Sequence, residues 1–304
     1  MERPMHILII LLLGCFISWP VFSMGEEDTR TLSIGVISNH PSKHIKKTRP
    51  LMGYLQKEMD VFGYQSYEII VKANIEDMIR SINRGEVDIV SETLYGASQI
   101  YQQTVMEPIL LRWKKNVSRY NSYFFTRKDS EIDVIEDVIG RKVVFEDPGS
   151  TSGYYLPMVA LKQHQLPVNH IQDLEEVGEP SMVNYVFSSD FTRRHNEVNI
   201  STWVYHRKVD VGVLSSVNWE DNEDVPIRIK EALKLIYKTP SVPRSYMLVR
   251  STLPASHKAA IKGILLQAHE SASAYKALKK YQKTSRFSEL SETDERLLES
   301  TLLF

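Results

Sequence analysis

Strand-like and helix-like segments alternate along almost the whole chain, and this alternation constrains the fold more than any other feature. A β-rich run at 31–38 is followed by an amphipathic segment at 49–59, a strand-like YEIIVK, a helix-like IEDMIRSINRG that ends at Gly85, and a buried run, VDIVSE. Strands and helices in this order build a mostly parallel sheet with helices on both faces. The sequence therefore predicts an α/β fold.

The alternation pauses near residues 120–125 and then resumes, which indicates a second sheet. An internal echo favours two similar halves, because Val87-Asp88 and Val209-Asp210 each open a buried run after a helix and an arginine-bearing turn. The chain is expected to cross back near 238–245, where TPSVPRS is proline-rich. We therefore expect two α/β lobes with the ligand cleft between them. The expected bounds are 24–122 with 241–304 for lobe 1 and 123–240 for lobe 2.

Residues 1–23 are typical of an export signal. One Arg precedes an apolar run from Ile7 to Ile17, which is too short to span a bilayer. Cleavage after Ser23 would leave 281 residues, the 304 of the chain less 23. A second possibility is a lipoprotein box, Leu12-Leu13-Gly14-Cys15, whose cysteine would carry a lipid anchor; that cut would leave FISWPVF at the start of the mature protein.

The composition argues against several classes of function. The formal net charge of −1 leaves no basic excess for a nucleic-acid backbone. Cys15 is the only cysteine, so an exported body without it has no disulfide, thiol nucleophile or cysteine-bound metal. The nine histidines show no metal-binding spacing. We expect a soluble exported body with no metal and no cofactor.

The stretch FEDPGSTSGYYLP, residues 145–157, predicts an anion site. Ser150, Thr151 and Ser152 stand between Gly149 and Gly153, where a strand-like run gives way to a helix-like one. A helix start offers unpaired N–H groups and a partial positive charge, and glycines let the backbone approach a ligand closely. Hydroxyl groups add donors that rotate to suit a tetrahedral oxyanion.

Two other interpretations of the turn stay open. Ser and Thr are common N-caps, so one of the hydroxyls is expected to cap the helix. A secreted hydrolase could use Thr151 or Ser152 as its nucleophile, but no spacing fixes a histidine base. The P-loop pattern is absent.

The same stretch, DPGSTSGYYLP, resembles the signature of the phosphate-, phosphite- and phosphonate-binding proteins of ABC importers, which typically carry DPxSTSGYxxP. SIGVISNHPSKHIKKTRPLMGYL, VDIVSETLYGASQIY and VDVGVLSSVNWE resemble other family segments and follow in the family's order. The resemblance implies a type II periplasmic-binding-protein fold and capture of phosphonate, phosphite or phosphate in the periplasm. It further implies delivery to an ABC permease in the inner membrane, without catalysis and as a monomer. The alternative is a sensory module with the same fold.

The resemblance also implies which residues bind the ligand. Ser150, Thr151 and Ser152, with their flanking glycines, match the family's anion-gripping turn, and Tyr95 lies where lobe 1 supplies a contact. Glu92 is a further candidate, as a buried carboxyl that accepts a ligand proton.

Several positions depart from the family pattern. Thr48 stands about where the family often has a ligand-facing Tyr. A gap-free alignment puts Glu197 where the family often has His, and His195 lies two residues earlier, so both are candidates. Ser215 and Ser216 replace acidic residues that receive amino groups in the family. Ser215 stays a ligand candidate, and a ligand with fewer donors than an aminoalkylphosphonate, or a different tetrahedral anion, is expected.

The basic run at 112–115, Arg112-Trp113-Lys114-Lys115, has two interpretations. It could attract anions to the mouth of the cleft. A charge run is more often a solvated face.

Overall fold

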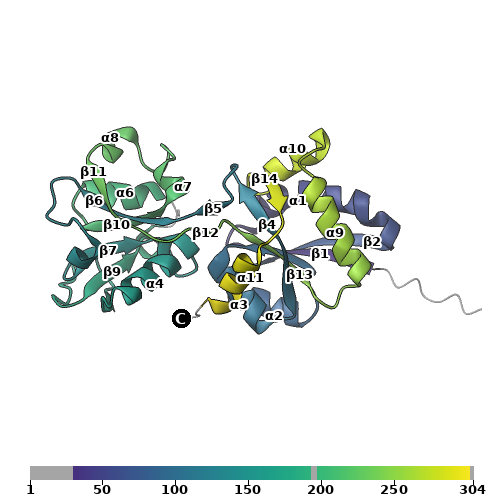
Figure 1. Cartoon of the computed structure of the whole chain (residues 1–304), viewed down its shortest axis with the longest axis horizontal. Helices are drawn as coiled ribbons and strands as arrows, with labels where there is room; N and C mark the ends of the chain where they lie inside the picture. The colour runs from purple at the N-terminus through teal and green to yellow at the C-terminus, as the bar shows by residue number, and fades with distance from the viewer. Residues whose placement is uncertain (1–29, 193–196, 302–304) are drawn as a thin grey trace, which may run out of the picture.

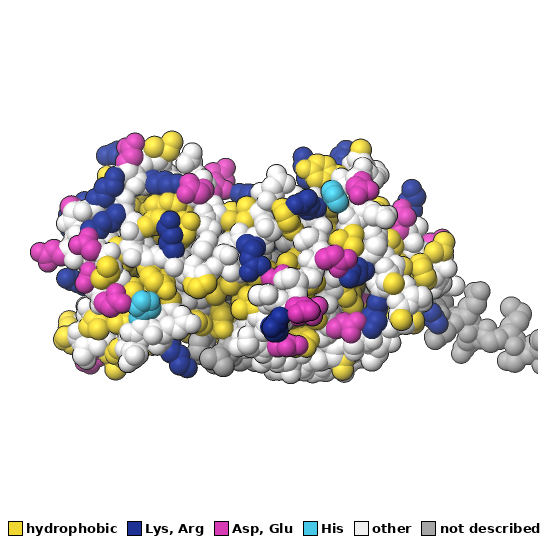
Figure 2. Space-filling model, in the orientation of Figure 1, with side chains coloured by type: hydrophobic (Ala, Val, Ile, Leu, Met, Phe, Trp, Pro, Cys, Tyr) yellow, Lys and Arg dark blue, Asp and Glu magenta, His cyan; other side chains and the backbone are white. Residues whose placement is uncertain are grey.

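The computed structural model describes residues 30–192 and 197–301, which form two lobes side by side (Figure 1). The expected export signal, Cys15 and His195 lie outside the described residues. Figure 2 shows acidic and basic side chains interspersed over one face of both lobes, in keeping with the small formal net charge. None of the described helices is both long and apolar enough to cross a bilayer.

Lobe 1 is built on a six-stranded sheet in the order β14-β4-β13-β3-β1-β2. Its strands are β1 Arg30–Ile37, β2 Tyr64–Lys72, β3 Ile89–Glu92, β4 Met106–Lys114, β13 Tyr246–Arg250 and β14 Thr284–Ser288. Its helices are α1 Pro41–Met59, η1 Asp60–Phe62, α2 Ile75–Asn83, α3 Leu94–Gln103, α9 Ala255–Gln267, α10 Ala272–Lys280 and α11 Glu292–Ser300. The C-terminal helices α9 and α10 pack against α1, and α11 packs against α3, so the chain returns to this lobe after visiting the other (Figure 1).

Lobe 2 is built on a second six-stranded sheet in the order β11-β6-β10-β7-β9-β8. Its strands are β6 Ser122–Arg127, β7 Lys142–Phe145, β8 Val168–His170, β9 Val183–Phe187, β10 Val211–Ser215 and β11 Leu233–Lys238. Its helices are η2 Ile135–Val138, η3 Thr151–Tyr155, α4 Leu156–Gln163, α5 Ser188–Phe191, α6 Glu197–Tyr205, α7 Ser216–Trp219 and α8 Ile227–Lys230.

The two lobes are joined by a two-stranded antiparallel ribbon, β5 Arg119–Tyr120 and β12 Val242–Pro243. Its strands run between the two sheets (Figure 1). We propose to divide the lobes at 122/123 and 240/241, next to this ribbon. Residues on it are placed to reach both lobes.

The two sheets share one plan, and the Val-Asp echo marks an equivalent contact in each. β1 pairs in parallel with β3, and β7 pairs in parallel with β10. The Asp88 carboxylate accepts a hydrogen bond from the backbone N–H of Ser33 at 2.9 Å, and Asp210 accepts one from Lys142 at 2.8 Å. In both lobes the aspartate therefore ties the start of a central strand to its parallel neighbour.

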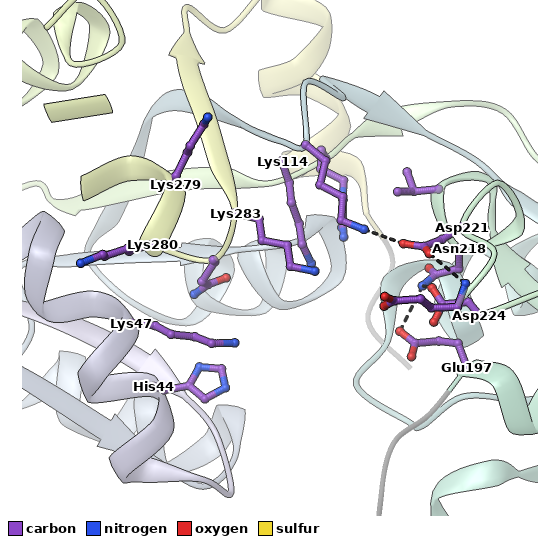
Figure 3. Close-up of a pocket in the computed structure, with 15 residues that line it drawn as sticks. His44, Lys47, Lys114, Glu197, Asn218, Asp221, Asp224, Lys279, Lys280 and Lys283 are labelled. Carbon is purple, nitrogen blue, oxygen red and sulfur yellow. Dashed lines mark hydrogen bonds and ion pairs between the residues drawn. The ribbon is translucent and has the colours of Figure 1, made fainter. Parts of the chain in front are cut away.

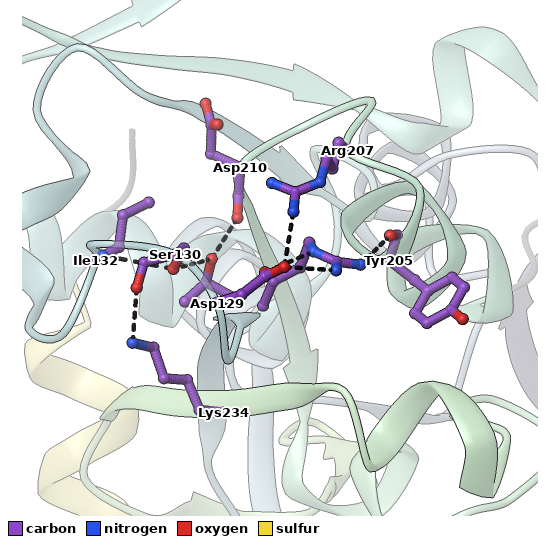
Figure 4. Close-up of polar contacts among 9 residues, drawn as sticks. Asp129, Ser130, Ile132, Tyr205, Arg207, Asp210 and Lys234 are labelled. Carbon is purple, nitrogen blue, oxygen red and sulfur yellow. Dashed lines mark hydrogen bonds and ion pairs between the residues drawn. The ribbon is translucent and has the colours of Figure 1, made fainter.

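The arginine-bearing turn before β10 is held by an ion-pair cluster. Arg207 has a left-handed backbone, φ 60°, which is uncommon outside glycine. Its guanidinium donates to Asp129 at 2.7 Å, and Arg127 donates to the same carboxylate and to the carbonyl of Tyr205 (Figure 4). These contacts hold the turn in a conformation that its own residue type disfavours.

Helix α1 begins earlier than the sequence suggested. The apolar pattern predicted a helix over 49–59, but α1 starts at Pro41. Pro41 suits the first helical turn, where its missing N–H is not needed, and Pro50 is tolerated inside the helix. The first two turns are polar, so the hydrophobic pattern marks only the buried part, which begins at Thr48.

Close packing in lobe 2 gives a stability prediction at Gly212, in β10. A Cβ there would lie 2.5 Å from the ζ carbon of Phe125 and 2.9 Å from a methyl group of Val204. Because both neighbours are fully buried, Gly212→Ala is expected to lower the free energy of unfolding by about 2 kcal/mol.

Urea denaturation measures the effect, with Gly263→Ala in α9 as the matched control. Apart from the neighbouring residues and backbone of its own helix, no described heavy atom lies within 4 Å of a Cβ at Gly263. That control should therefore stabilise the chain by up to about 1 kcal/mol, as expected for Gly→Ala inside a helix. Equal stability of Gly212→Ala and the wild type would contradict the packing argument.

Candidate functional site

The hydroxyl-rich turn follows β7 and opens the π-helical turn η3, which α4 continues. Ser150 is the N-cap: its hydroxyl accepts the N–H of Gly153 at 2.9 Å and donates to Glu146 Oε2 at 2.6 Å. The N–H of Gly149 donates to Asp147 Oδ1 at 2.8 Å. One of the three hydroxyls therefore caps the helix, as the N-cap interpretation requires.

Thr151 links the two lobes. Its hydroxyl accepts the backbone N–H of Tyr95 at 2.9 Å and donates to Thr93 Oγ1 at 2.8 Å. Thr93 is the N-cap residue of α3, and the Tyr95 ring stacks on Tyr155 with the ring centres 4.5 Å apart. The positive ends of α3 and η3 thus meet at one hydroxyl, an arrangement that an anion between them would stabilise.

Two donors, Tyr120 on β5 and Arg244 directly after β12, reach the same junction. The Tyr120 hydroxyl is buried beside the hydroxyls of Ser152 and Thr151, but no described atom meets it in hydrogen-bond geometry. The Arg244 guanidinium lies 4.5 Å from the centre of the Tyr120 ring, and its Nε is buried and likewise unpaired. Burial raises the pKa of Tyr120, so its hydroxyl stays a donor. Unpaired buried donors are costly, and these two mark space for an acceptor.

A half-buried glutamate also precedes each helix start. Burial raises the pKa of Glu92 to about 7, against the opposing charge of Arg112. Burial raises the pKa of Glu146 to about 7 as well, with Asp147 and Glu197 adding to the effect. Both groups are therefore partly protonated near neutral pH, and a protonated carboxyl can donate a hydrogen bond to an anion.

Gly153 leaves the space that Glu146 occupies. A Cβ at Gly153 would lie 2.5 Å from the Cβ of Glu146 and 2.6 Å from its Oε2. The glycine is therefore required by close packing of the turn against the strand end.

A cavity of about 440 Å³ lies between the lobes, next to the junction (Figure 3). The three hydroxyls of the turn are not among its lining residues, but Arg244 and Glu197 are. Its lobe 1 side is basic, and Figure 3 shows lysines of α1, β4 and the α10–β14 segment there. Its lobe 2 side is acidic: Asn218 Nδ2 donates to Glu197 Oε1 at 3.1 Å and to Asp224 Oδ2 at 2.8 Å.

The remaining candidates are spread over different places. Glu197 begins α6 and lines the cavity. Ser215 is buried as the N-cap of α7, where its hydroxyl accepts the N–H of Asn218 at 3.0 Å and donates to the side chain of that residue. Thr48 is buried in α1, and its hydroxyl is unpaired within the described part of the chain.

The solvated-face interpretation of the basic run is wrong for Arg112. Its side chain is only 4% exposed and donates to hydroxyls of Ser91, Ser245 and Thr284. It also lies over the Tyr281 ring. Arg112 is an inward position of β4, and its buried charge is satisfied by these partners.

Sequence reasoning missed Tyr120 and Arg244. Neither stands in a motif, and their role depends on the ribbon that brings 119–120 beside 242–243. Lys114 and Lys115, from the basic run considered for anion attraction, line the cavity. The lysines from α1 and the α10–β14 segment were missed, since only the folded chain brings them beside β4.

Comparisons with known proteins agree with this geometry. The family model described as "ABC transporter, phosphonate, periplasmic substrate-binding protein" matches residues 34–295. The phosphonates-binding periplasmic protein of Escherichia coli (strain K12) is 24% identical over 247 residues, or 77% of this chain. The chain spans 65% of the length of that relative.

Solved structures share the fold. XAC2383 from Xanthomonas citri, solved bound to chloride ion and bound to ATP, is 28% identical, with TM-scores of 0.81 and 0.80; each match covers 88% of this chain and 94% of that one. PhnD1 from Prochlorococcus marinus (MIT 9301), solved with methylphosphonate, is 17% identical over 89% of this chain and 97% of its own, with a TM-score of 0.62. The predicted type II periplasmic-binding-protein fold is confirmed.

Proposed function

Because the chain belongs to the family of periplasmic substrate-binding proteins of phosphonate ABC transporters, we propose that it captures a tetrahedral oxyanion where α3 meets η3. The ligand is phosphonate, phosphite or phosphate, taken up in the periplasm by a monomer and delivered to an ABC permease in the inner membrane. Family membership supports the transport role, and the site supports the ligand class.

The contact of Thr151 with the start of α3 carries the proposal. An anion inserted there would accept hydrogen bonds from N–H groups of two helix starts, one from each lobe. Tyr120 and Arg244 would add donors that lack acceptors among the described residues, and Ser152 lies beside the Tyr120 hydroxyl. Since the donors come from both lobes, binding the anion also favours the closed arrangement that a permease would recognise.

The site is better suited to binding than to catalysis. Thr151, one of the two candidate nucleophiles, donates its proton to the hydroxyl of Thr93. A nucleophilic hydroxyl would instead need to donate to a general base.

Isothermal titration calorimetry with phosphate, phosphite, methylphosphonate and sulfate tests the proposal. We expect at least one of these anions to bind, and Ser152→Ala to weaken that binding about tenfold through loss of one charge-assisted hydrogen bond. Ser273→Ala, at an exposed position on α10, is the control and should bind like the wild type. Folded protein that binds none of the four anions would refute the proposed ligand class.

A further inference from the structure

The lobe 1 side of the interlobe cavity carries more positive charge than one phosphoryl group needs. In Figure 3 the amino groups of Lys47, Lys114 and Lys283 are directed towards the opening between the lobes. They come from α1, from the end of β4 and from the segment after α10. Arg244 lines the same cavity and extends the row towards the hydroxyl-rich turn. We call these four residues the cation row.

The protein itself does not neutralise the cation row. Within residues 30–192 and 197–301, none of the four forms an ion pair with a carboxylate. Burial lowers the pKa of Lys114 to about 7; Arg244, Arg112 and Lys283 lower it further, and the charge of Glu197 opposes them only in part. Burial, with Lys43 and Lys283, also lowers the pKa of Lys47. A bound anion would relieve this mutual repulsion.

The cation row begins where the proposed oxyanion site ends. Arg244 lies over the Tyr120 ring, and the Tyr120 hydroxyl lies beside Ser152. A line of positive charge therefore leads from the turn into the cavity. The cavity volume of about 440 Å³ is in the range of roughly 300–1,000 Å³ typical of pockets for drug-sized ligands. Methylphosphonate would occupy only a small part of it.

The acidic lobe 2 side of the cavity determines how a ligand is oriented. Glu197 and Asp224 share the amide of Asn218, and their remaining lone pairs can accept further hydrogen bonds. These carboxylates would repel phosphoryl oxygens and would accept hydrogen bonds from hydroxyl or amino groups. Negative groups of a ligand are thus directed to lobe 1, and its organic part to lobe 2.

We infer that the cavity extends the oxyanion site into a site for an organic polyphosphate. One phosphoryl group lies at the turn, one or two more lie along the cation row, and an organic part rich in hydroxyl or amino groups lies against Glu197 and Asp224. This inference rests on the proposed function and narrows its ligand class.

Calorimetry with the exported chain tests the inference, using phosphate, methylphosphonate, inorganic tripolyphosphate and ATP as probes. Tripolyphosphate is expected to bind about a hundredfold more tightly than phosphate, because it gains about two charge-assisted contacts worth roughly tenfold each. ATP should bind more tightly still if the organic part contacts lobe 2. Comparing tripolyphosphate with ATP therefore shows whether the ligand is an inorganic or an organic polyphosphate.

The variant Lys283→Gln is expected to weaken tripolyphosphate and ATP binding about tenfold and to change phosphate binding less than about twofold. Lys276→Gln removes the same charge from an exposed position on α10 and should change neither. Glu197→Gln should weaken ATP binding relative to tripolyphosphate binding, because it removes an acceptor for the organic part and also a charge that repels phosphoryl oxygens.

Each result that differs from these expectations contradicts a specific part of the inference or of the proposed function. If phosphate or methylphosphonate binds but the polyphosphates bind no more tightly, or Lys283→Gln has no effect, the extended site is wrong and the proposed function stands. If Ser152→Ala leaves the affinity for the polyphosphates unchanged, the ligand binds in the cavity alone, and the inference that it reaches the hydroxyl-rich turn is wrong. ATP that binds no more tightly than tripolyphosphate refutes the organic subsite. Failure of all four anions refutes the proposed function together with this inference.

Discussion

Replacing Thr151 by valine is expected to weaken oxyanion binding about a hundredfold. The hydroxyl stands where the starts of α3 and η3 meet, and it both accepts from Tyr95 and donates to Thr93. Valine keeps the shape of the side chain but removes one donor from the proposed anion site and breaks the contact that holds the start of α3 against η3, which the anion would bridge. Two such losses correspond to about 2.7 kcal/mol, or a hundredfold in affinity.

Calorimetry with the anion that the wild type binds best measures this loss. Thr93→Val should cost less, because Thr151 still accepts the N–H of Tyr95 in that variant. Thr202→Val, which removes a hydroxyl from α6, is the matched control and should leave the affinity unchanged. Wild-type affinity in Thr151→Val would show that the anion does not bind between the two helix starts.

The fold class could be predicted because it depends on patterns that are local in sequence. Alternating apolar runs, glycine-ended helices and the two Val-Asp echoes each report on a neighbouring strand or helix. The repeated Val-Asp pair has a structural role, because Asp88 and Asp210 make the same contact to a parallel strand in the two lobes. The start of α1 could not be predicted from this pattern, since its first turns bury no apolar side chain before Thr48.

The candidate site could be predicted only in part, for the opposite reason. The turn at 149–153 carries a local signature, so its position at a strand-to-helix junction was evident. What faces it depends on contacts between residues far apart in sequence: Thr93 is 58 residues from Thr151, and Tyr120 and Arg244 arrive on the ribbon or directly after it. The ligand-binding roles of Ser150, Thr151, Ser152, Tyr95 and Ser215 stay predictions, and so does that of His195.

Electrostatic properties of the site were also hidden in the sequence. Glu92 was a candidate because of its place near the cleft, but Glu146 was not, since a glutamate at the end of a strand is usually solvated. Burial in the folded chain raises the pKa values of both carboxyls to about 7, and the charges of Asp147 and Glu197 add to the effect at Glu146.

The second large effect that we expect is a loss of stability between pH 4.5 and 7. In the unfolded chain, Glu92 and Glu146 release their protons near pH 4.5, whereas in the folded chain both keep them until about pH 7. The folded state therefore binds more protons in this window, and the free energy of unfolding falls as the pH rises. The fall is on the order of 3 kcal/mol for each group, from a shift of about 2.5 pH units.

Other titratable groups change the pH dependence of stability below pH 6.5 and above pH 7. Burial lowers the pKa values of His44 and His257, so both histidines oppose the fall below pH 6.5, with smaller shifts. Lys114, with a pKa of about 7 instead of 10.5, holds fewer protons in the folded chain above pH 7, so its contribution rises with pH there. A minimum of stability near pH 7 is therefore expected for the chain without ligand.

Urea denaturation at pH 5, 6, 7 and 8 measures how the free energy of unfolding depends on pH. Glu146→Gln and Glu92→Gln should each reduce the fall in this free energy between pH 5 and 7 by about half. Glu231→Gln, at an exposed position after α8, should leave the pH dependence unchanged. Stability that stays constant or rises between pH 5 and 7 would contradict the burial of both carboxyls. An anion bound at the junction favours the protonated carboxyls, so its affinity should fall as both carboxyls ionise above pH 7.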